Sequence, residues 1–235
     1  MNGQTFHLSG VLMTALPSGA LWLPGAGLLC VSDLHLGKSD RIARRLGLML
    51  PPYEVAATLD RLDADLAATR AATVICLGDS FDDLAAADSL TLPERLRLTA
   101  MQAGRRWIWI EGNHDSGPVD LGGTHLAEYR DGPLTFRHIA EPGAGGEVSG
   151  HYHPKTALPG AGASRPCFVT DGRRLILPAY GAYTGGLSAA TPVLRDLFGD
   201  RAVAILTGRR CLTVPLPRPD PDRGARRPGL RGRSG

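Results

Sequence analysis

Histidine and acidic side chains gather in four short motifs along the chain, and their types suit the binding of divalent metal ions. The motifs are Asp33-Leu-His35, Gly78-Asp79, Gly112-Asn113-His114-Asp115 and Gly150-His151-Tyr-His153. With the isolated His138, they contain five of the seven histidines of the chain. Carboxylate oxygens and imidazole nitrogens are common ligands of Mn²⁺, iron and Zn²⁺. One such residue alone is more often a turn former or a hydrogen-bonded polar group, but four clusters together predict a shared metal site.

The first three motifs each follow a short apolar run that is typical of a buried strand. These runs are residues 27–31, 73–77 and 107–110. Between them, residues 55–66 carry apolar side chains at helical spacing, and a second helix is expected over residues 93–103. Alternating strands and helices predict an α/β fold with a mostly parallel sheet. Asp33 and His35 are two residues apart, so an extended segment would direct both side chains to one face.

After Asp115 the pattern changes to short apolar segments separated by turns rich in glycine and proline. The expected strands are residues 134–139, 147–149, 167–170, 174–177, 202–206 and 211–214. They predict a second, largely antiparallel sheet that packs on the first. The expected fold is therefore a double β-sheet sandwich flanked by helices.

The length of 235 residues favours one domain, over residues 1–214, followed by a tail of different composition. Residues 215–235 are rich in proline, glycine and arginine and carry six arginines and two aspartates, which predicts a disordered basic tail. Residues 1–214 contain 20 basic and 21 acidic residues, so the domain itself is close to neutral. A neutral domain lacks the clustered lysines and arginines that proteins binding duplex DNA usually show.

The chain is expected to be cytoplasmic and to have no membrane segment. Its first 19 residues lack the basic and apolar regions of a signal peptide, and no apolar stretch approaches the length of a membrane span. The four cysteines stand in apolar runs without a CxxC pair: Cys30, Cys76, Cys167 and Cys211. Two disulfides are arithmetically possible, but a chain with a large core has little need of them, so buried free thiols are favoured.

Taken in order, the motifs resemble those of the calcineurin-like metallophosphoesterase superfamily. The pattern is Asp-x-His, Gly-Asp-x-x-Asp ending at Asp82, Gly-Asn-His-Asp, a lone His and Gly-His-x-His, and it spans residues 33–153. The resemblance implies a phosphoesterase with a double β-sandwich fold and two divalent metal ions. It implies that one ion is bound by Asp33, His35, Asp79 and His153, and the other by Asp79, Asn113, His138 and His151. Asp79 would bridge the ions, and His114 would act beside the leaving group.

Three further stretches resemble a narrower group, the bacterial ligase-associated DNA-damage-response phosphoesterases, which are described as nucleases. The stretches are Asp33-Leu-His-Leu-Gly-Lys38, Gly150-His-Tyr-His-Pro-Lys155 and residues 177–186, LPAYGAYTGG. The resemblance implies an endonuclease or phosphodiesterase that cleaves DNA or RNA and is associated with a DNA ligase or helicase in repair. The ligand set contains no thiolate and suits Mn²⁺, Fe or Zn²⁺, and the resemblance places Mn²⁺ first.

This ligand set would leave a positive centre that attracts phosphate. Two divalent ions, two carboxylates and one hydroxide sum to about +1, which also stabilises the added charge of the transition state. His114 is not needed as a ligand and could donate a proton to the leaving oxygen, with Asp115 as its orienting partner. Alternatively, His114 only positions the phosphate. Asp82 is expected to orient a ligand without binding an ion.

Three classes of function remain open from the sequence. The first is a nuclease or phosphodiesterase acting on nucleic acid, and the second is an enzyme for cyclic nucleotides or similar small diesters. The third is a non-catalytic scaffold, which is disfavoured because every expected ligand is retained. Tyr180 and Tyr183 could stack on a base or simply occupy a turn. Lys38 could contact substrate phosphate or be a solvated residue at a helix start.

Overall fold

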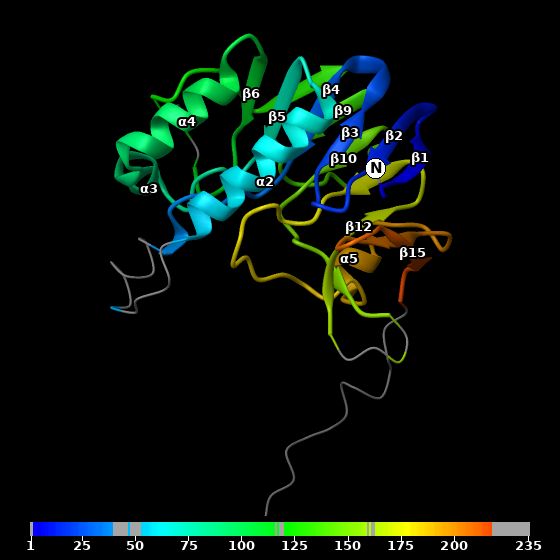
Figure 1. The fold of residues 1–235 in the computed structure, drawn as a ribbon. Helices are drawn as coiled ribbons and strands as arrows, with labels where there is room; N and C mark the ends of the chain where they lie inside the picture. Colours follow the sequence, from blue (N-terminus) through cyan, green and yellow to red (C-terminus); the bar gives the residue numbers. More distant parts are fainter. Residues whose placement is uncertain are drawn as a thin grey trace, which may run out of the picture.

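Two β-sheets and a few helices make up the fold of this computed structural model, which describes residues 2–39, 47, 53–115, 117, 120–158, 160 and 163–217 (Figure 1). The first sheet has seven strands that pair in chain order. They are β1 (Gln4–Leu8), β2 (Val11–Ala15), β3 (Leu21–Leu23), β4 (Leu28–Val31), β5 (Thr73–Leu77), β6 (Arg106–Ile110) and β7 (Thr124–Leu126). Pairing is antiparallel from β1 to β4 and parallel from β4 to β7. The expectation of a mostly parallel sheet therefore holds for only half of it.

The second sheet has eight strands in the order β15-β14-β12-β13-β10-β9-β8, with β11 paired to β12. They are β8 (Glu128–Asp131), β9 (Leu134–Arg137), β10 (Glu147–Ser149), β11 (Lys155–Thr156), β12 (Arg165–Thr170), β13 (Arg174–Ile176), β14 (Val203–Leu206) and β15 (Leu212–Pro215). It is largely antiparallel, as expected, but β10 runs parallel to both β9 and β13. The double β-sheet sandwich flanked by helices is confirmed.

Helices pack on the outer face of each sheet. They are the 3₁₀ helix η1 (Pro24–Ala26) and the α-helices α2 (Glu54–Thr69), α3 (Leu84–Ser89), α4 (Leu92–Gln102) and α5 (Pro192–Arg195). Helices α2 and α4 are those expected from the sequence. The start of α4 is fixed because Glu94 accepts a hydrogen bond from the Thr91 backbone N–H at 2.8 Å. Among the described helices, none has both the length and the apolar character that crossing a membrane requires.

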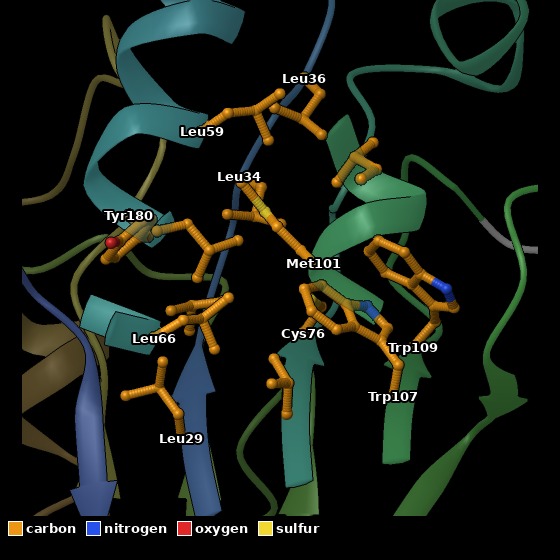
Figure 2. Close-up of a cluster of buried hydrophobic side chains, with 14 of the residues drawn as sticks. Leu29, Leu34, Leu36, Leu59, Leu66, Cys76, Met101, Trp107, Trp109 and Tyr180 are labelled. Atoms are coloured by element: carbon orange, nitrogen blue, oxygen red, sulfur yellow. The ribbon is translucent and has the colours of Figure 1, made fainter. Parts of the chain in front are cut away.

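Strands β4, β5 and β6 are apolar at almost every position because both of their faces are buried. One face, including Leu29, Cys76 and Trp109, packs with Leu59, Leu66 and Met101 of α2 and α4 (Figure 2). The opposite face supplies Cys30, Ile75 and Ile108, which pack with Phe136, Val148 and Phe168 of the second sheet. The three strands are thus fixed from both sides, and their carboxyl ends form a rigid edge.

The folded part extends slightly beyond the expected boundary at residue 214. Strand β15 runs to Pro215, and Leu216 is 5% exposed in a cluster with Ala202 and Ala204. The rest of the expected tail, residues 218–235, lies outside the described residues. All four cysteines are unpaired, as expected.

Candidate metal centre

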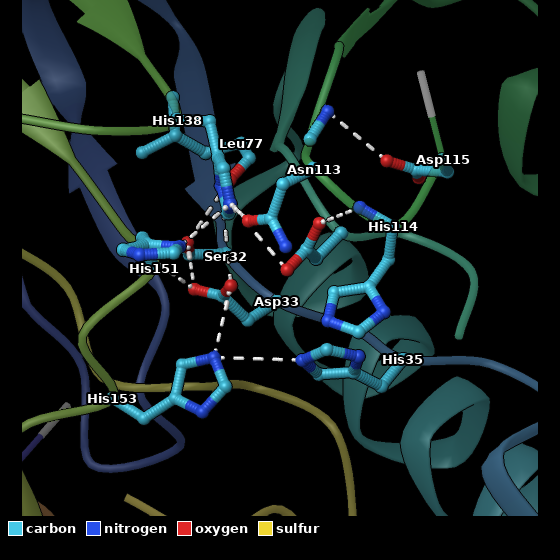
Figure 3. Close-up of polar contacts among 12 residues, drawn as sticks. Ser32, Asp33, His35, Leu77, Asn113, His114, Asp115, His138, His151 and His153 are labelled. Carbon is cyan, nitrogen blue, oxygen red and sulfur yellow. Dashed lines mark hydrogen bonds and ion pairs between the residues drawn. The ribbon is translucent and has the colours of Figure 1, made fainter. Parts of the chain in front are cut away.

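The sequence motifs converge where loops from both sheets meet (Figure 3). Asp33 and His35 follow β4, Asp79 follows β5, Asn113 follows β6, His138 follows β9, and His151 and His153 follow β10. Backbone hydrogen bonds join these loops: the N–H groups of Asp33 and His35 donate to the carbonyls of Gly78 and Asp79 at 3.2 and 3.0 Å. The Gly150 N–H donates to the His138 carbonyl at 2.9 Å, which ties the two loops of the second sheet together.

Asp33, His35 and His153 form the first group of potential ligands. Nε2 of His153 lies 3.0 Å from Oδ1 of Asp33 and 3.4 Å from Nε2 of His35. Asp33 is fully buried, and its other oxygen accepts hydrogen bonds from the Ser32 hydroxyl at 2.5 Å and the His151 N–H at 3.0 Å. These two bonds leave Oδ1 directed towards the histidines.

Asp79, His138 and His151 form the second group. Nε2 of His138 lies 3.2 Å from Nδ1 of His151, 3.4 Å from Oδ2 of Asp79 and 2.9 Å from Oδ1 of Asn113. Asn113 is thus placed with this group, as the resemblance implied. Nδ1 of His138 is 4.0 Å from Oδ1 of Asp33, so the two groups adjoin each other.

Polar contacts at Nδ1 of two of the histidine rings favour one tautomer of each ring. Nδ1 of His35 lies 3.0 Å from Oδ1 of Asp82, and Nδ1 of His138 lies 3.3 Å from the Leu77 carbonyl. Since both partners are acceptors, Nδ1 keeps the proton when each ring is neutral, and Nε2 then presents a lone pair. In the first group, the lone pair of His35 then points to the same space as the Asp33 carboxylate. In the second group, the lone pair of His138 points towards the Asp79 carboxylate. This donor set fits a divalent cation in each group.

The charged forms of both carboxylates are favoured. Burial raises the pKa of Asp79, but the hydrogen bond and charge of His138 and the His114 backbone N–H outweigh it and lower that pKa below its usual value. Burial likewise raises the pKa of Asp33. The hydrogen bonds from His153 and Ser32 and the charges of His153 and His138 outweigh burial, so this pKa is also lowered. Both groups therefore supply the anionic oxygens that a metal ion needs.

Five of these residues adopt the left-handed backbone conformation that side chains usually avoid. They are Asp33 (φ 53°), His35 (φ 45°), Asp79 (φ 44°), His151 (φ 69°) and His153 (φ 45°). The expectation that Asp33 and His35 share a face of an extended segment was therefore wrong in its geometry, although both side chains reach the site. Such strained residues persist only where surrounding contacts hold them, and they concentrate at functional sites.

Two glycines allow the loops to approach closely. A Cβ atom on Gly78 would lie 2.1 Å from Nδ1 of His138, and one on Gly112 would lie 2.2 Å from Oδ1 of Asp79. Gly78 also has a φ of +72°. The glycine in each motif is therefore required by packing within the site.

His114 lies beside both groups and is half-buried. Its N–H donates to Oδ1 of Asp79 at 2.9 Å, its Nδ1 is 3.2 Å from the Asp82 carbonyl, and its ring meets the His35 ring edge-on at 5.6 Å. Asp82 thus contacts His35 through its carboxylate and His114 through its carbonyl. The first contact has the geometry expected of an orienting residue, and the second was not foreseen.

Asp115 was expected to orient His114, but the structure gives its carboxylate other partners. Oδ2 accepts hydrogen bonds from the N–H groups of Ser80 and Phe81 at 2.7 and 3.1 Å, and Oδ1 accepts one from Gly112 at 3.0 Å. Asp115 is 7% exposed, so these bonds tie the loop after β6 to the loop after β5 in a buried position. That expectation is corrected: Asp115 fastens two ligand loops.

The three candidate substrate residues have different surroundings. Tyr180 is fully buried, and its hydroxyl donates to Oδ2 of Asp65 at 2.8 Å, so the expectation that its ring stacks on a base is wrong. Tyr183 is 55% exposed and has a left-handed φ of 59°, so its ring is accessible. Lys38 is partly exposed, and among the described residues no hydrogen bond or ion pair joins it to a candidate ligand.

Comparisons with known proteins identify a family and a similar fold. Residues 27–163 match the family described as calcineurin-like phosphoesterases. The fold is similar to the crystal structure of Pseudomonas putida nuclease MPE, with a TM-score of 0.73 and 27% identity over 90% of this chain and 100% of that one. No curated protein sequence matches the chain. Since the family match covers more than half of the sequence, the chain belongs to the calcineurin-like phosphoesterase family and is a metal-dependent phosphoesterase.

Proposed function

We propose that the protein is a dinuclear phosphodiesterase that cleaves nucleic acid, with DNA as the foremost substrate. The observation that carries this proposal is the pair of adjoining ligand groups, Asp33, His35, His153 and Asp79, His138, His151. The 4.0 Å distance between Nδ1 of His138 and Oδ1 of Asp33 supports treating the two groups as parts of one centre. Two neighbouring divalent ions are the arrangement that many enzymes use for in-line displacement at phosphorus.

The proposed ligands of the first ion are Asp33, His35 and His153, and those of the second are Asn113, His138 and His151. We assign Asp79 as the bridge between them. Its side chain is almost fully buried, and Oδ2 faces His138 while Oδ1 accepts the His114 N–H. All ligands are nitrogen or oxygen atoms, which suits Mn²⁺, Fe or Zn²⁺. We propose Mn²⁺.

When bound, the two ions would supply Lewis acidity towards the phosphate and towards the attacking water. His114 is assigned as the group that protonates the leaving oxygen. Its Nδ1–H donates to the Asp82 carbonyl at 3.2 Å, so Nε2 is the nitrogen from which a proton can be transferred. Asp82 also fixes the tautomer of His35 through its carboxylate. One residue therefore orients both a ligand and the proton donor.

A nucleic-acid substrate is supported by the similarity to a protein named as a nuclease, whose whole chain is covered. The exposed ring of Tyr183 offers a surface for base stacking. The six arginines of residues 215–235 supply positive charge that can neutralise phosphates. The proposal includes a functional association with a DNA ligase or helicase in DNA repair.

A specific feature favours small diesters as a second candidate. A cavity of about 460 Å³ opens beside Asn113 and His138, a size typical of small-molecule sites. Its charged lining residues are Glu111, Glu128, Glu141 and Arg137, and Arg137 pairs with both Glu128 and Glu141. The lining is net negative, so it disfavours a further phosphate and suits an uncharged nucleoside. A cyclic nucleotide would place its nucleoside there.

The deciding experiment uses protein stripped of metal and reloaded with Mn²⁺, Fe²⁺ or Zn²⁺ singly. Its substrates are single- and double-stranded DNA, RNA, cyclic nucleotides, a nitrophenyl diester and a nitrophenyl monoester. We expect cleavage of DNA and of the diester, strongest with Mn²⁺. Turnover of cyclic nucleotides without nucleic-acid cleavage would establish the second candidate instead. Absence of hydrolysis with every metal and substrate would contradict both.

A further inference from the structure

Tyr180 is buried, but its backbone lies directly against the loop that carries Asp33 and His35. The Tyr180 N–H donates to the Ser32 carbonyl at 2.7 Å, and the Gly181 N–H donates to the Asp33 carbonyl at 3.1 Å. The approach is so close that a Cβ atom on Gly181 would lie 2.0 Å from the Leu34 carbonyl oxygen. Residues 180 and 181 therefore brace the ligand loop from behind.

The other side of this segment is attached to α2. The Tyr180 hydroxyl donates to Oδ2 of Asp65 at 2.8 Å, and the Arg61 guanidinium lies over the Tyr180 ring at 4.9 Å. The Ala182 N–H donates to the hydroxyl of Thr58 at 3.0 Å. Thr58, Arg61 and Asp65 are spaced by three and four residues, so they lie on one face of the helix. Helix α2 thus provides a fixed support for residues 180–182.

The same segment continues to the loop of His153. The Leu187 N–H donates to the Tyr152 carbonyl at 3.3 Å, and the Lys155 ammonium group donates to the Thr184 carbonyl at 2.9 Å. Residues 180–187 therefore touch the loops of Asp33 and His153, the two parts of the first ligand group that come from different sheets. Asp33, His35 and His153 all have left-handed backbones, which need such external support.

We infer that Tyr180 is a positioning residue for the metal ion of Asp33, His35 and His153. Its hydroxyl fastens residues 180–187 to α2, and its backbone keeps Asp33 in the conformation that directs Oδ1 into the site. The inference rests on the proposed function only in requiring that this group binds a metal ion. It predicts that loss of the Tyr180 hydroxyl weakens the binding of the first ion and leaves the affinity for the second ion unchanged.

The test is direct titration of Mn²⁺ into metal-free protein that retains one site at a time. In a His151→Ala background, which keeps the first group, Tyr180→Phe should weaken Mn²⁺ binding by roughly tenfold or more, the range seen when a residue supporting a ligand is removed. In a His153→Ala background, which keeps the second group, Tyr180→Phe should change nothing. Two tight sites in the wild-type protein are the precondition, and their absence would refute the proposed metal centre rather than this inference.

Controls separate positioning from general stability. Tyr129→Phe removes a tyrosine hydroxyl that also meets a charged partner, Arg106 at 3.0 Å, and should leave both affinities unchanged. Asp65→Ala should reproduce the Tyr180→Phe effect, Asp65→Asn should restore part of it because its amide oxygen still accepts, and the double variant should not be additive. Lowered thermal stability with unchanged Mn²⁺ affinity, or equal weakening of both sites, would overturn the inference.

Discussion

Nε2 of His35 and Nε2 of His153 face each other at 3.4 Å, although the residues are 118 positions apart. Because the Asp82 carboxylate lies 3.0 Å from Nδ1 of His35, the neutral ring keeps its proton on Nδ1 and turns the lone pair of Nε2 towards His153. Oδ1 of Asp33 lies 3.0 Å from the same His153 nitrogen. A divalent cation bound here would be held by these nitrogen and oxygen atoms, and the first prediction concerns the residue that orients His35.

Asp82→Ala should weaken binding of the first ion by about 10–100-fold, because His35 loses the partner that fixes its tautomer and orientation. Mn²⁺ titration of the metal-free protein measures the effect. Asp88→Ala is the matched control, since that side chain is 92% exposed and lies 3.9 Å from Arg95. Equal affinities in the Asp82 and Asp88 variants would show that the contact with His35 has no role in metal binding.

Asp79→Ala should reduce metal content more than any other single ligand substitution, because it removes the proposed bridge. Metal analysis after gel filtration should find well under one ion per chain. His151→Ala is the comparison, since it removes a ligand of the second group only and should leave close to one ion. If Asp79→Ala also retained one tightly bound ion, Asp79 would belong to the second group alone.

His114→Ala should slow the cleavage of substrates with poor leaving groups far more than of those with good ones. A nitrophenolate leaves without a proton, whereas a ribose alkoxide needs one, and general acid catalysis typically contributes ~10²–10⁴-fold. The ratio of kcat/KM losses on DNA and on a nitrophenyl diester should therefore reach at least tens of fold. Metal content should remain near that of the wild type. The same loss on both substrates would mean that His114 only positions the phosphate.

The end of the folded domain can be tested with two truncations. Removal of residues 218–235 should leave the free energy of unfolding unchanged, because the strand β15 and Leu216 are retained. Removal of residues 215–235 also deletes Leu216, whose N–H donates to the Ala202 carbonyl at 2.9 Å, and should cost about 2–4 kcal/mol. Urea unfolding measures both. Equal stability of the two proteins would return the boundary to residue 214.

The shorter truncation also tests the role of the arginines. If the arginines contact nucleic acid, removal of residues 218–235 should lower the affinity for DNA. It should also flatten the dependence of that affinity on salt concentration, since fewer counterions are released. Hydrolysis of a nitrophenyl diester should be unaffected. An unchanged salt slope would exclude these residues from substrate binding.

The sequence could predict that the candidate ligand side chains lie together, because their types and order form a compact pattern. It could also predict strands β4–β6, because strands that are buried on both faces are continuously apolar. The hairpin of β1 and β2 was not predicted. Its signal was the two-residue turn Ser9-Gly10, with φ of 48° and 84°, between strands of alternating burial. That signal is weak in a partly exposed, mixed-polarity segment.

Other features depend on contacts distant in sequence and leave no local pattern. The left-handed conformations of Asp33 and His35 arise from hydrogen bonds with residues 78–80 and 181. The burial of Tyr180 depends on Asp65, 115 positions away, and the carboxylate of Asp115 is engaged by the loop after β5. The glycine-rich sequence around Tyr180 also suits an exposed turn, and an aspartate next to His114 also suits a catalytic pair. The sequence therefore predicted an accessible ring for Tyr180 and an orienting role for Asp115, and both predictions were wrong.

The most direct test of the two-metal account is a titration of stripped protein with Mn²⁺ while bound metal and diester hydrolysis are measured together. Metal-free protein should be inactive, and binding should saturate at two ions per chain. Activity should rise mainly as the second ion binds, because both ligand groups must be filled for catalysis. Full activity in protein shown to contain no metal, or maximal activity with one ion bound, would contradict the account.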